Sequence, residues 1–519
     1  MSTDSCAVRS RARQGRGTLL RLAASAVLLA AGAVGAQTAP YQAPQRLDIG
    51  TGLGQHELPK GGVFEPRAEL ALQYAANLEL AADGEPQVDQ AGVELVPGFY
   101  ASYSTPAVVA AMDYSLVGRA WEDSDYNDLS HRLAANGQWS AVPEWFSLRG
   151  RASYDDTVID SRAGANYGGL GIFGSSNLAE VATASVTPVL QHRFNVFEFG
   201  ADYSYGRTWY LDAGKGQPVA GFVDQQDSTD QAASVRFGTA RTGSKLSAQA
   251  SYQWQKSEFE TALPYQYERA GLDVGLRIAR SLWLVGDVGQ ESDLDVSTTE
   301  GGLDSGFWSA GLRWEPNERS SAELRYGEQF FGSSYSVRVE HRARRLEFFA
   351  SYAEQPTVET RLLSLGEFDP GQLPPGSPDV GLGFLTSEPY VARDARAGIV
   401  LQGSRTTLRI TGGQFERDYL RARQYDQTDT TGSLGVTRQL ASNLSADATV
   451  TYTDYERVFA SVDPLPPVRT DDYDTQAILR LNRRSGDRLT LTGETGYLQR
   501  AGDDPYDGWW VALRARYTP

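Results

Sequence analysis

The feature that most limits how this chain can fold is a regular two-residue alternation of side-chain character, repeated along most of its length. Between residues 307 and 352 the alternation runs through four consecutive segments separated by turns. Successive side chains on a β-strand point to opposite faces, so each segment predicts a strand with one mostly apolar and one mostly charged or small face. In the first of these segments Trp308, Ala310, Leu312 and Trp314 alternate with Phe307, Ser309, Gly311 and Arg313.

The connections between the alternating segments differ in length in a regular way. Short turns are separated by long, acidic, Pro- or Gly-rich loops, and this asymmetry is typical of outer-membrane barrels. About 22 strands are expected between residue 65 and the C-terminus, and an even number places both termini on the short-turn, periplasmic side. The short turns include 242–244, 280–281, 403–404 and 485–486, and the long loops include 156–178, 206–227, 291–302, 356–388 and 456–471.

A membrane location follows from the need to satisfy the backbone. In lipid every peptide group must be hydrogen-bonded within the protein, so only helices or a closed sheet can span. After the N-terminus no run of uninterrupted apolar residues reaches the length of a spanning helix, and the mean hydropathy is −0.40. We therefore predict an all-β fold, a transmembrane up-and-down antiparallel β-barrel over residues 65–519, rather than soluble β-sandwiches. Aromatic residues near strand ends suit the two interfacial girdles: Trp121, Tyr126, Trp139, Trp145, Phe146, Trp314, Tyr352, Tyr497 and Tyr517.

The first 36 residues have the pattern of a cleaved signal peptide. A basic stretch is followed by an uncharged run from Leu22 to Ala36, which ends in small residues. Residues 37–64 are then a short periplasmic segment, and we expect the protein in the outer membrane of a Gram-negative cell. The one cysteine, Cys6, leaves with the signal, so disulfides and thiolate metal sites are excluded from the mature chain.

One part of the chain resembles a known family. The run from Phe307 to Arg319, with the aromatic and glycine residues after it and the basic run 341–345, resembles the outer-membrane β-barrel family associated with PEP-CTERM/exosortase systems. The specific part is confined to about 300–355. The resemblance implies a place in exopolysaccharide export or assembly, with the barrel-assembly machinery as a partner. The usual terminal aromatic residue is replaced here by Tyr517 followed by Thr518 and Pro519.

Few residues suggest a catalytic, cofactor-binding or metal-binding site. The spacing of Gly169, Gly171 and Gly174 matches a dinucleotide-binding motif, but this stretch lies in a predicted loop without the helix that would hold a phosphate. The four histidines show no paired spacing, and no Ser, His and acid trio is selected. We therefore expect no enzyme, no cofactor and no metal site. A net charge of −17 argues against nucleic acid as a partner.

Acidic clusters recur in the predicted loops. They are either solvated surfaces that resist aggregation or sites for divalent cations that bridge to lipopolysaccharide, and the sequence leaves both open. Outer-membrane lipid and lipopolysaccharide are the expected partners, with exopolysaccharide as a further one. The clusters include Asp123 and Asp125, Asp155 and Asp156, Asp224, Asp227 and Asp230, and Asp471, Asp472 and Asp474.

The polar face of the central strands carries a ladder of opposite charges. Neighbouring strands lie about 4.8 Å apart, so these side chains can pair laterally inside the barrel. Such a ladder either braces the wall or binds a hydroxyl-rich sugar, and the two roles are compatible. The lumen-facing charged ladder consists of Arg313, Glu323, Arg325, Arg338, Glu340, Arg342 and Glu347.

The sequence therefore predicts a passive conduit for exopolysaccharide export or assembly. A porin-like diffusion channel and a structural or adhesive barrel without transport are the alternatives. A barrel of about 22 strands encloses a lumen wide enough to need a plug. Because residues 37–64 are too few for a plug domain, the loop 356–388 is the first candidate for folding inward.

Overall fold

The computed structural model describes most of the chain after residue 60. The predicted signal peptide, the turn 242–244 and Gly169–Gly174 lie outside the described residues, as does most of the segment 37–64. The described ranges are 61–158, 178–211, 226–239, 245–294, 302–365, 387–420, 426–459, 468–502 and 505–519.

Within these ranges 22 strands form one antiparallel sheet, together with a short 3₁₀ helix, η1 (Ser124–Tyr126), and one α-helix, α2 (Glu359–Leu365). The strands are β1 (Gly61–Ala75), β2 (Gln90–Ser104), β3 (Val108–Trp121), β4 (Asp128–Val142), β5 (Phe146–Val158), β6 (Leu178–Phe194), β7 (Phe197–Tyr210), β8 (Ser228–Thr239), β9 (Leu246–Phe259), β10 (Tyr265–Ala279), β11 (Leu282–Glu291), β12 (Ser305–Asn317), β13 (Ser320–Gln329), β14 (Gly332–Arg342), β15 (Leu346–Thr357), β16 (Tyr390–Gln402), β17 (Thr406–Tyr419), β18 (Gln427–Ala441), β19 (Leu444–Phe459), β20 (Val468–Ser485), β21 (Leu489–Ala501) and β22 (Tyr506–Tyr517).

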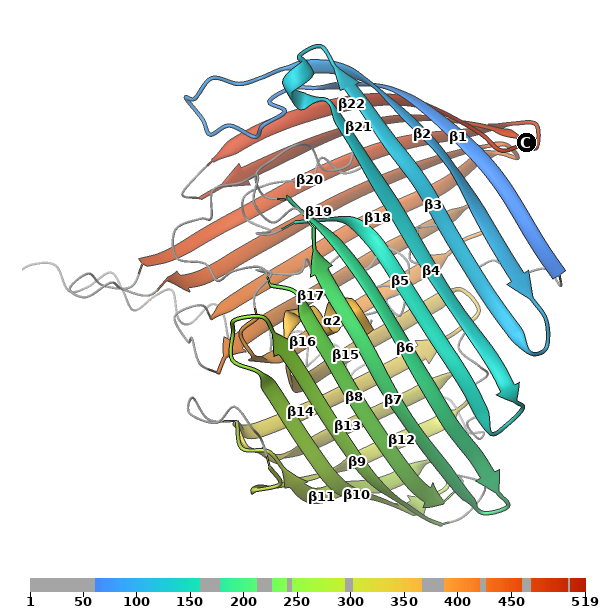
Figure 1. Ribbon diagram of the computed structural model, residues 1–519, viewed down its shortest axis with the longest axis vertical. Helices are drawn as coiled ribbons and strands as arrows, with labels where there is room; N and C mark the ends of the chain where they lie inside the picture. Colours follow the sequence, from blue (N-terminus) through green and yellow to red (C-terminus); the bar gives the residue numbers. More distant parts are fainter. Residues whose placement is uncertain are drawn as a thin grey trace, which may run out of the picture.

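The sheet closes on itself. Each strand pairs with the next along the chain, and β1 also pairs with β22, from Ala68 opposite Tyr517 to Ala75 opposite Trp510. Figure 1 shows the blue first strands beside the red last strands. Closure leaves the backbone of the first and last strands hydrogen-bonded, as a membrane span requires. The predicted up-and-down barrel is confirmed, and its first strand begins at Gly61 rather than at residue 65.

The two faces of the barrel wall differ in the way that the alternation predicts. Leu284, Leu312 and Leu324 lie opposite one another on three adjacent strands and are 48%, 47% and 54% exposed. Their exposed side chains form part of an apolar outer belt, while the alternate positions face the lumen and are mostly polar or small, with buried exceptions such as Trp283 and Val285 on β11. No described helix is long and apolar enough to cross a membrane. A closed sheet with an apolar exterior identifies the chain as an outer-membrane β-barrel.

Loop lengths at the two ends also match the prediction. The short connections 280–281, 403–405 and 486–488 lie at the end where β1 begins and β22 finishes. The long connections, among them 292–304 and 358–389, lie at the other end. The short-turn end therefore faces the periplasm, and the barrel's first and last strands both terminate there.

The predicted aromatic girdles are correct only in part. Trp139, Trp145 and Tyr497 are exposed on the outer surface. Trp121, however, is only 6% exposed, because it falls on the lumen face of β3 and packs in a buried cluster with Trp510. The β1–β2 loop covers this cluster with two leucines. Aromatic content alone does not show which face of a strand a ring occupies.

Candidate functional site in the barrel lumen

A helix lies inside the barrel and narrows its lumen. The helix α2 follows directly after β15, and it contacts β6, β7 and β8 on the wall that it faces. In Figure 1 it lies between the green strands β6–β8 and the orange strands behind them. Within the predicted plug loop 356–388, residues 356 and 357 belong to β15, the inward fold is confirmed for residues 358–365, and 366–386 lie outside the described residues.

One side of α2 is held by a buried aspartate of the wall. Asp230 on β8 accepts hydrogen bonds from Ser228 at 3.0 Å and from Ser257 of the next strand at 2.6 Å. From α2 it accepts a bond from Ser364 at 2.8 Å and a longer one from Thr360 at 3.4 Å. Four hydroxyl groups thus donate to this carboxylate. Two belong to the wall, Ser228 and Ser257, and two belong to α2, Thr360 and Ser364.

Close packing completes this attachment. Val358, just before α2, is fully buried against Tyr265 and Tyr267 of β10. On β7, Gly206 lies directly under the end of the helix, where an added Cβ would come within 2.8 Å of the Leu365 side chain. A side chain at position 206 would therefore push the helix away from the wall.

The first residue of α2 reaches a different part of the wall. Glu359 accepts a hydrogen bond from the Tyr390 hydroxyl of β16, and its carboxylate lies 3.9 Å from the Arg417 guanidinium of β17. Arg417 donates to Asp429 of β18 at 2.8 Å. All four side chains are buried. Burial raises the pKa of Glu359, which the Arg417 charge and the Tyr390 hydroxyl oppose.

Aromatic rings surround this arginine. Tyr390, Phe415 and Tyr419 form a buried cluster, and the Arg417 guanidinium lies 4.4 Å from the centre of the Phe415 ring. Gln427 is the register partner of Arg417 on β18 and is 2% exposed. Its side-chain amide makes no hydrogen bond with any described residue. We call Tyr390, Phe415, Arg417, Tyr419, Gln427 and Asp429 the Arg417 patch.

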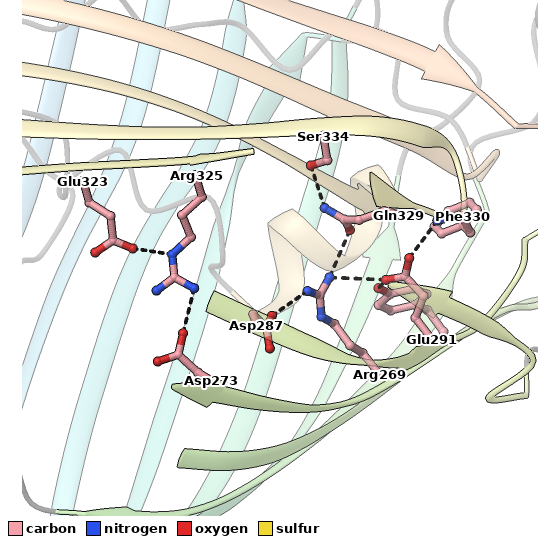
Figure 2. A network of polar contacts seen from close by, with 10 residues as sticks. Arg269, Asp273, Asp287, Glu291, Glu323, Arg325, Gln329, Phe330 and Ser334 are labelled. Carbon is pink, nitrogen blue, oxygen red and sulfur yellow. Dashed lines mark hydrogen bonds and ion pairs between the residues drawn. The ribbon is translucent and has the colours of Figure 1, made fainter. Parts of the chain in front are cut away.

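A second arginine, on β10, is bound by charged and polar partners on the strands that follow (Figure 2). Arg269 donates to Asp287 at 3.0 Å, to Glu291 at 3.2 Å and to Gln329 at 3.0 Å. Glu291 is fully buried and also accepts a bond from the Phe330 backbone amide at 2.7 Å. These partners belong to β11, to β13 and to the short connection that follows β13, so the network joins several strands of one wall.

Part of the predicted charged ladder forms a continuous chain beside this network. Glu323 pairs with Arg313 on β12 and with Arg325 of its own strand at 2.6 Å. Arg325 also donates to Asp273 at 2.7 Å (Figure 2). Asp273 lies three strands away on β10, a partner that the lateral-neighbour argument missed. The alternation of β10 places Arg269 and Asp273 on the same, lumen-facing side, and this sequence feature could have identified Asp273 as a possible partner.

The rest of the ladder is less connected. Arg342 pairs with Glu347 at 3.1 Å beside an exposed periplasmic turn. Arg338 and Glu340 are exposed on β14, and neither forms an ion pair with a described residue. The structure thus brings together Arg313, Glu323 and Arg325 on one part of the wall and Arg342 and Glu347 on another.

On either side of the charged wall the lumen is lined by hydroxyl groups. Hydroxyl pairs join neighbouring strands at these positions and share the face on which the charged ladder lies, as the register requires. They are Ser153 with Thr183 at 2.6 Å, Thr187 with Ser204 at 2.9 Å, Thr411 with Ser433 at 2.6 Å and Thr431 with Thr453 at 3.4 Å.

Several acidic residues expected in loops lie instead in strands. Asp230 belongs to β8 and is buried, Asp155 and Asp156 belong to β5, and Asp472 and Asp474 belong to β20. The strands extend further toward the loop end than the alternation indicated, because polar side chains can face the lumen there. No group of three His, Cys, Asp or Glu among the described residues is arranged to hold a metal ion.

Comparisons with known proteins assign no family to this chain. No protein-family model matches the sequence, and no curated protein is significantly similar to it. Similar solved structures include the FrpB iron transporter from Neisseria meningitidis, with 10% identity and a TM-score of 0.49 over 89% of this chain and 83% of that one. The siderophore receptor PirA from Acinetobacter baumannii is 9% identical with a TM-score of 0.47, over 90% and 81%. A ferric enterobactin receptor, PfeA from Pseudomonas aeruginosa, is 12% identical with a TM-score of 0.46, over 88% and 82%.

Proposed function

We propose that this barrel is a conduit through which an exopolysaccharide crosses the outer membrane. The observation that carries the proposal is the lining of the lumen: hydroxyl pairs flank an ion-paired wall, so a hydroxyl-rich chain meets hydrogen-bonding groups on the walls that it passes. The resemblance of residues 307–345 to barrels of PEP-CTERM/exosortase systems supports the same substrate class.

The position of α2 supports controlled rather than free passage. The helix is bonded to Asp230 on one part of the wall and to Tyr390 on another, so it crosses part of the lumen. The alternatives are a channel, through which only small solutes cross the membrane, and a purely structural barrel, through which nothing crosses.

Single-channel conductance of the purified barrel in a planar bilayer tests whether a pore exists. The intact protein is compared with a variant in which residues 359–388 are replaced by a short Gly-Ser linker. We expect small or rare conductance steps in the intact barrel and large, stable steps in the variant. Silence in both proteins, with folding confirmed by heat-modified electrophoretic mobility, would favour the structural barrel.

Loss of the gene tests the substrate. We expect polymer to accumulate in the periplasm and to decrease on the cell surface, with both restored by the intact gene. Unchanged surface polymer together with a conducting barrel would contradict export and favour the porin-like channel.

A further inference from the structure

The Arg417 patch has the composition of a ligand site. Two tyrosines and a phenylalanine lie beside an arginine, an aspartate and a glutamine, on the lumen face of three adjacent strands at their loop end. Sugar rings stack their C–H faces on aromatic side chains, and Arg, Asp and Gln bind hydroxyl and carboxylate groups with directional hydrogen bonds. The patch offers both kinds of contact in one place.

The group that now fills the patch does not belong to the wall. It is the carboxylate of Glu359, the first residue of α2, which accepts a bond from Tyr390 and lies 3.9 Å from Arg417. A carboxylate on a mobile ligand would meet the same two donors. Glu359 therefore occupies the patch in the same way as the carboxylate of an acidic ligand would.

The patch does not depend on Glu359 for its own charge balance. Arg417 is bound more closely by Asp429, at 2.8 Å, than by Glu359, at 3.9 Å. On the other side of the helix, Asp230 retains Ser228 and Ser257 when Ser364 is removed. Because both walls keep partners of their own, α2 can leave without stranding a buried charge.

Gln427 gives an independent indication of a ligand. Its amide is buried within the patch, and both its oxygen and its nitrogen lack a hydrogen-bond partner among the described residues. Leaving such a group unpaired costs about 1–3 kcal/mol. A ligand with hydroxyl groups beside its carboxylate would satisfy the amide, which Glu359 does not.

We propose that the Arg417 patch is a binding site for a carboxylate-bearing sugar unit, and that Glu359 holds the place of the sugar carboxylate when no sugar is bound. Arg417 and Tyr390 bind the carboxylate, Gln427 binds ring hydroxyls, and Tyr419 packs against the ring. Binding displaces Glu359 and with it the first turn of α2. The proposal rests on the conduit function and names the substrate class that the conduit recognises.

Calorimetric titration of the detergent-solubilised full-length barrel with an oligomer of galacturonic acid tests the site. Replacement of Glu359 by alanine removes the competing carboxylate, so we expect binding about tenfold tighter than in the unaltered protein, or about 1.4 kcal/mol. Gln427→Ala is expected to weaken binding about tenfold, because the amide no longer meets a hydroxyl. Arg338→Ala, a lumen-facing arginine outside the patch, is the matched control and should leave affinity unchanged.

Three results would overturn the proposal. These are equal binding of a neutral glucose oligomer, unchanged affinity in Glu359→Ala, and a loss of affinity in Arg338→Ala but not in Gln427→Ala. The titration is independent of conductance and of polymer export. A conducting, exporting barrel that binds no galacturonate therefore retains the function without this site, and a barrel that binds galacturonate but exports nothing retains the site without the function.

Discussion

The wall network around Arg269 and the Arg417 patch both surround an arginine with acidic side chains, yet their partners differ in origin. The hydrogen-bond partners of Arg269 are Asp287, Glu291 and Gln329, which all belong to wall strands. Arg417 pairs with Asp429 on the wall, at 2.8 Å, and lies 3.9 Å from Glu359 on α2. The first arrangement braces the barrel, whereas the second contains one position that a ligand can take. The same residue types therefore serve two purposes.

The largest effect is expected where the bracing network is broken. Arg269→Ala leaves Glu291 buried with only neutral donors, including Tyr267 and the Phe330 amide, so we expect the free energy of unfolding to fall by about 3 kcal/mol. Guanidinium unfolding in detergent, followed by tryptophan fluorescence, measures it. Arg338→Ala is the control and should change the free energy by no more than about 0.5 kcal/mol. Equal losses in the two variants would mean that the network does not brace the wall.

Backbone spacing in the bracing wall gives the next largest effect. At Gly311 an added Cβ would lie 1.9 Å from the backbone oxygen of Leu324, so Gly311→Ala forces β12 and β13 apart. We expect a loss of about 1–3 kcal/mol in the free energy of unfolding. At Gly435 on β18 the nearest atom is 3.8 Å from an added Cβ, and Gly435→Ala should be close to neutral. The same unfolding assay compares them, and a neutral Gly311→Ala would contradict the close approach.

The two regions also differ in how far the sequence predicts them. Contacts between Arg313, Glu323 and Arg325 follow from alternation, because lateral neighbours on adjacent strands share a face. The contact from Arg325 to Asp273 depends on the curvature of the wall, which alternation does not describe. The contacts of α2 are harder still, since Ser364 and Asp230 are 134 positions apart and meet only when the barrel has closed. The loop was predicted to fold inward, but neither of its wall partners was.

A variant that displaces α2 changes the Arg417 patch and leaves the bracing wall intact, so it distinguishes the two regions more directly. Gly206→Val places a side chain against Leu365 and Ser364, which destabilises the closed position by about 1–3 kcal/mol. That shifts the ratio of open to closed barrels about 5–150-fold, which single-channel open probability measures. Gly435→Val, at a lumen position away from α2, is the control. If both valine variants gate like the unaltered protein, α2 does not restrict the pore.

The smallest effect is the dependence of α2 on pH, which involves one carboxyl group. Glu359 faces Arg417, Asp429 and Tyr390, and it also interacts electrostatically with Tyr210 on β7. Its pKa is raised while it is buried, and returns to the ordinary value of a glutamate when α2 moves into water. The return of α2 to its closed, buried position is therefore accompanied by proton uptake at Glu359.

It follows that the closed position is favoured most below the ordinary pKa and loses that advantage as the pH rises through the raised one. We expect open probability to increase with pH in this window, by at most about tenfold per pH unit for one proton. Glu359→Gln, which keeps the shape of the protonated acid, should remain closed across the same range. A pH dependence that persists unchanged in Glu359→Gln would assign it to the carboxylates of the wall, and would make the bracing network rather than the patch the part of the lumen that responds to protons.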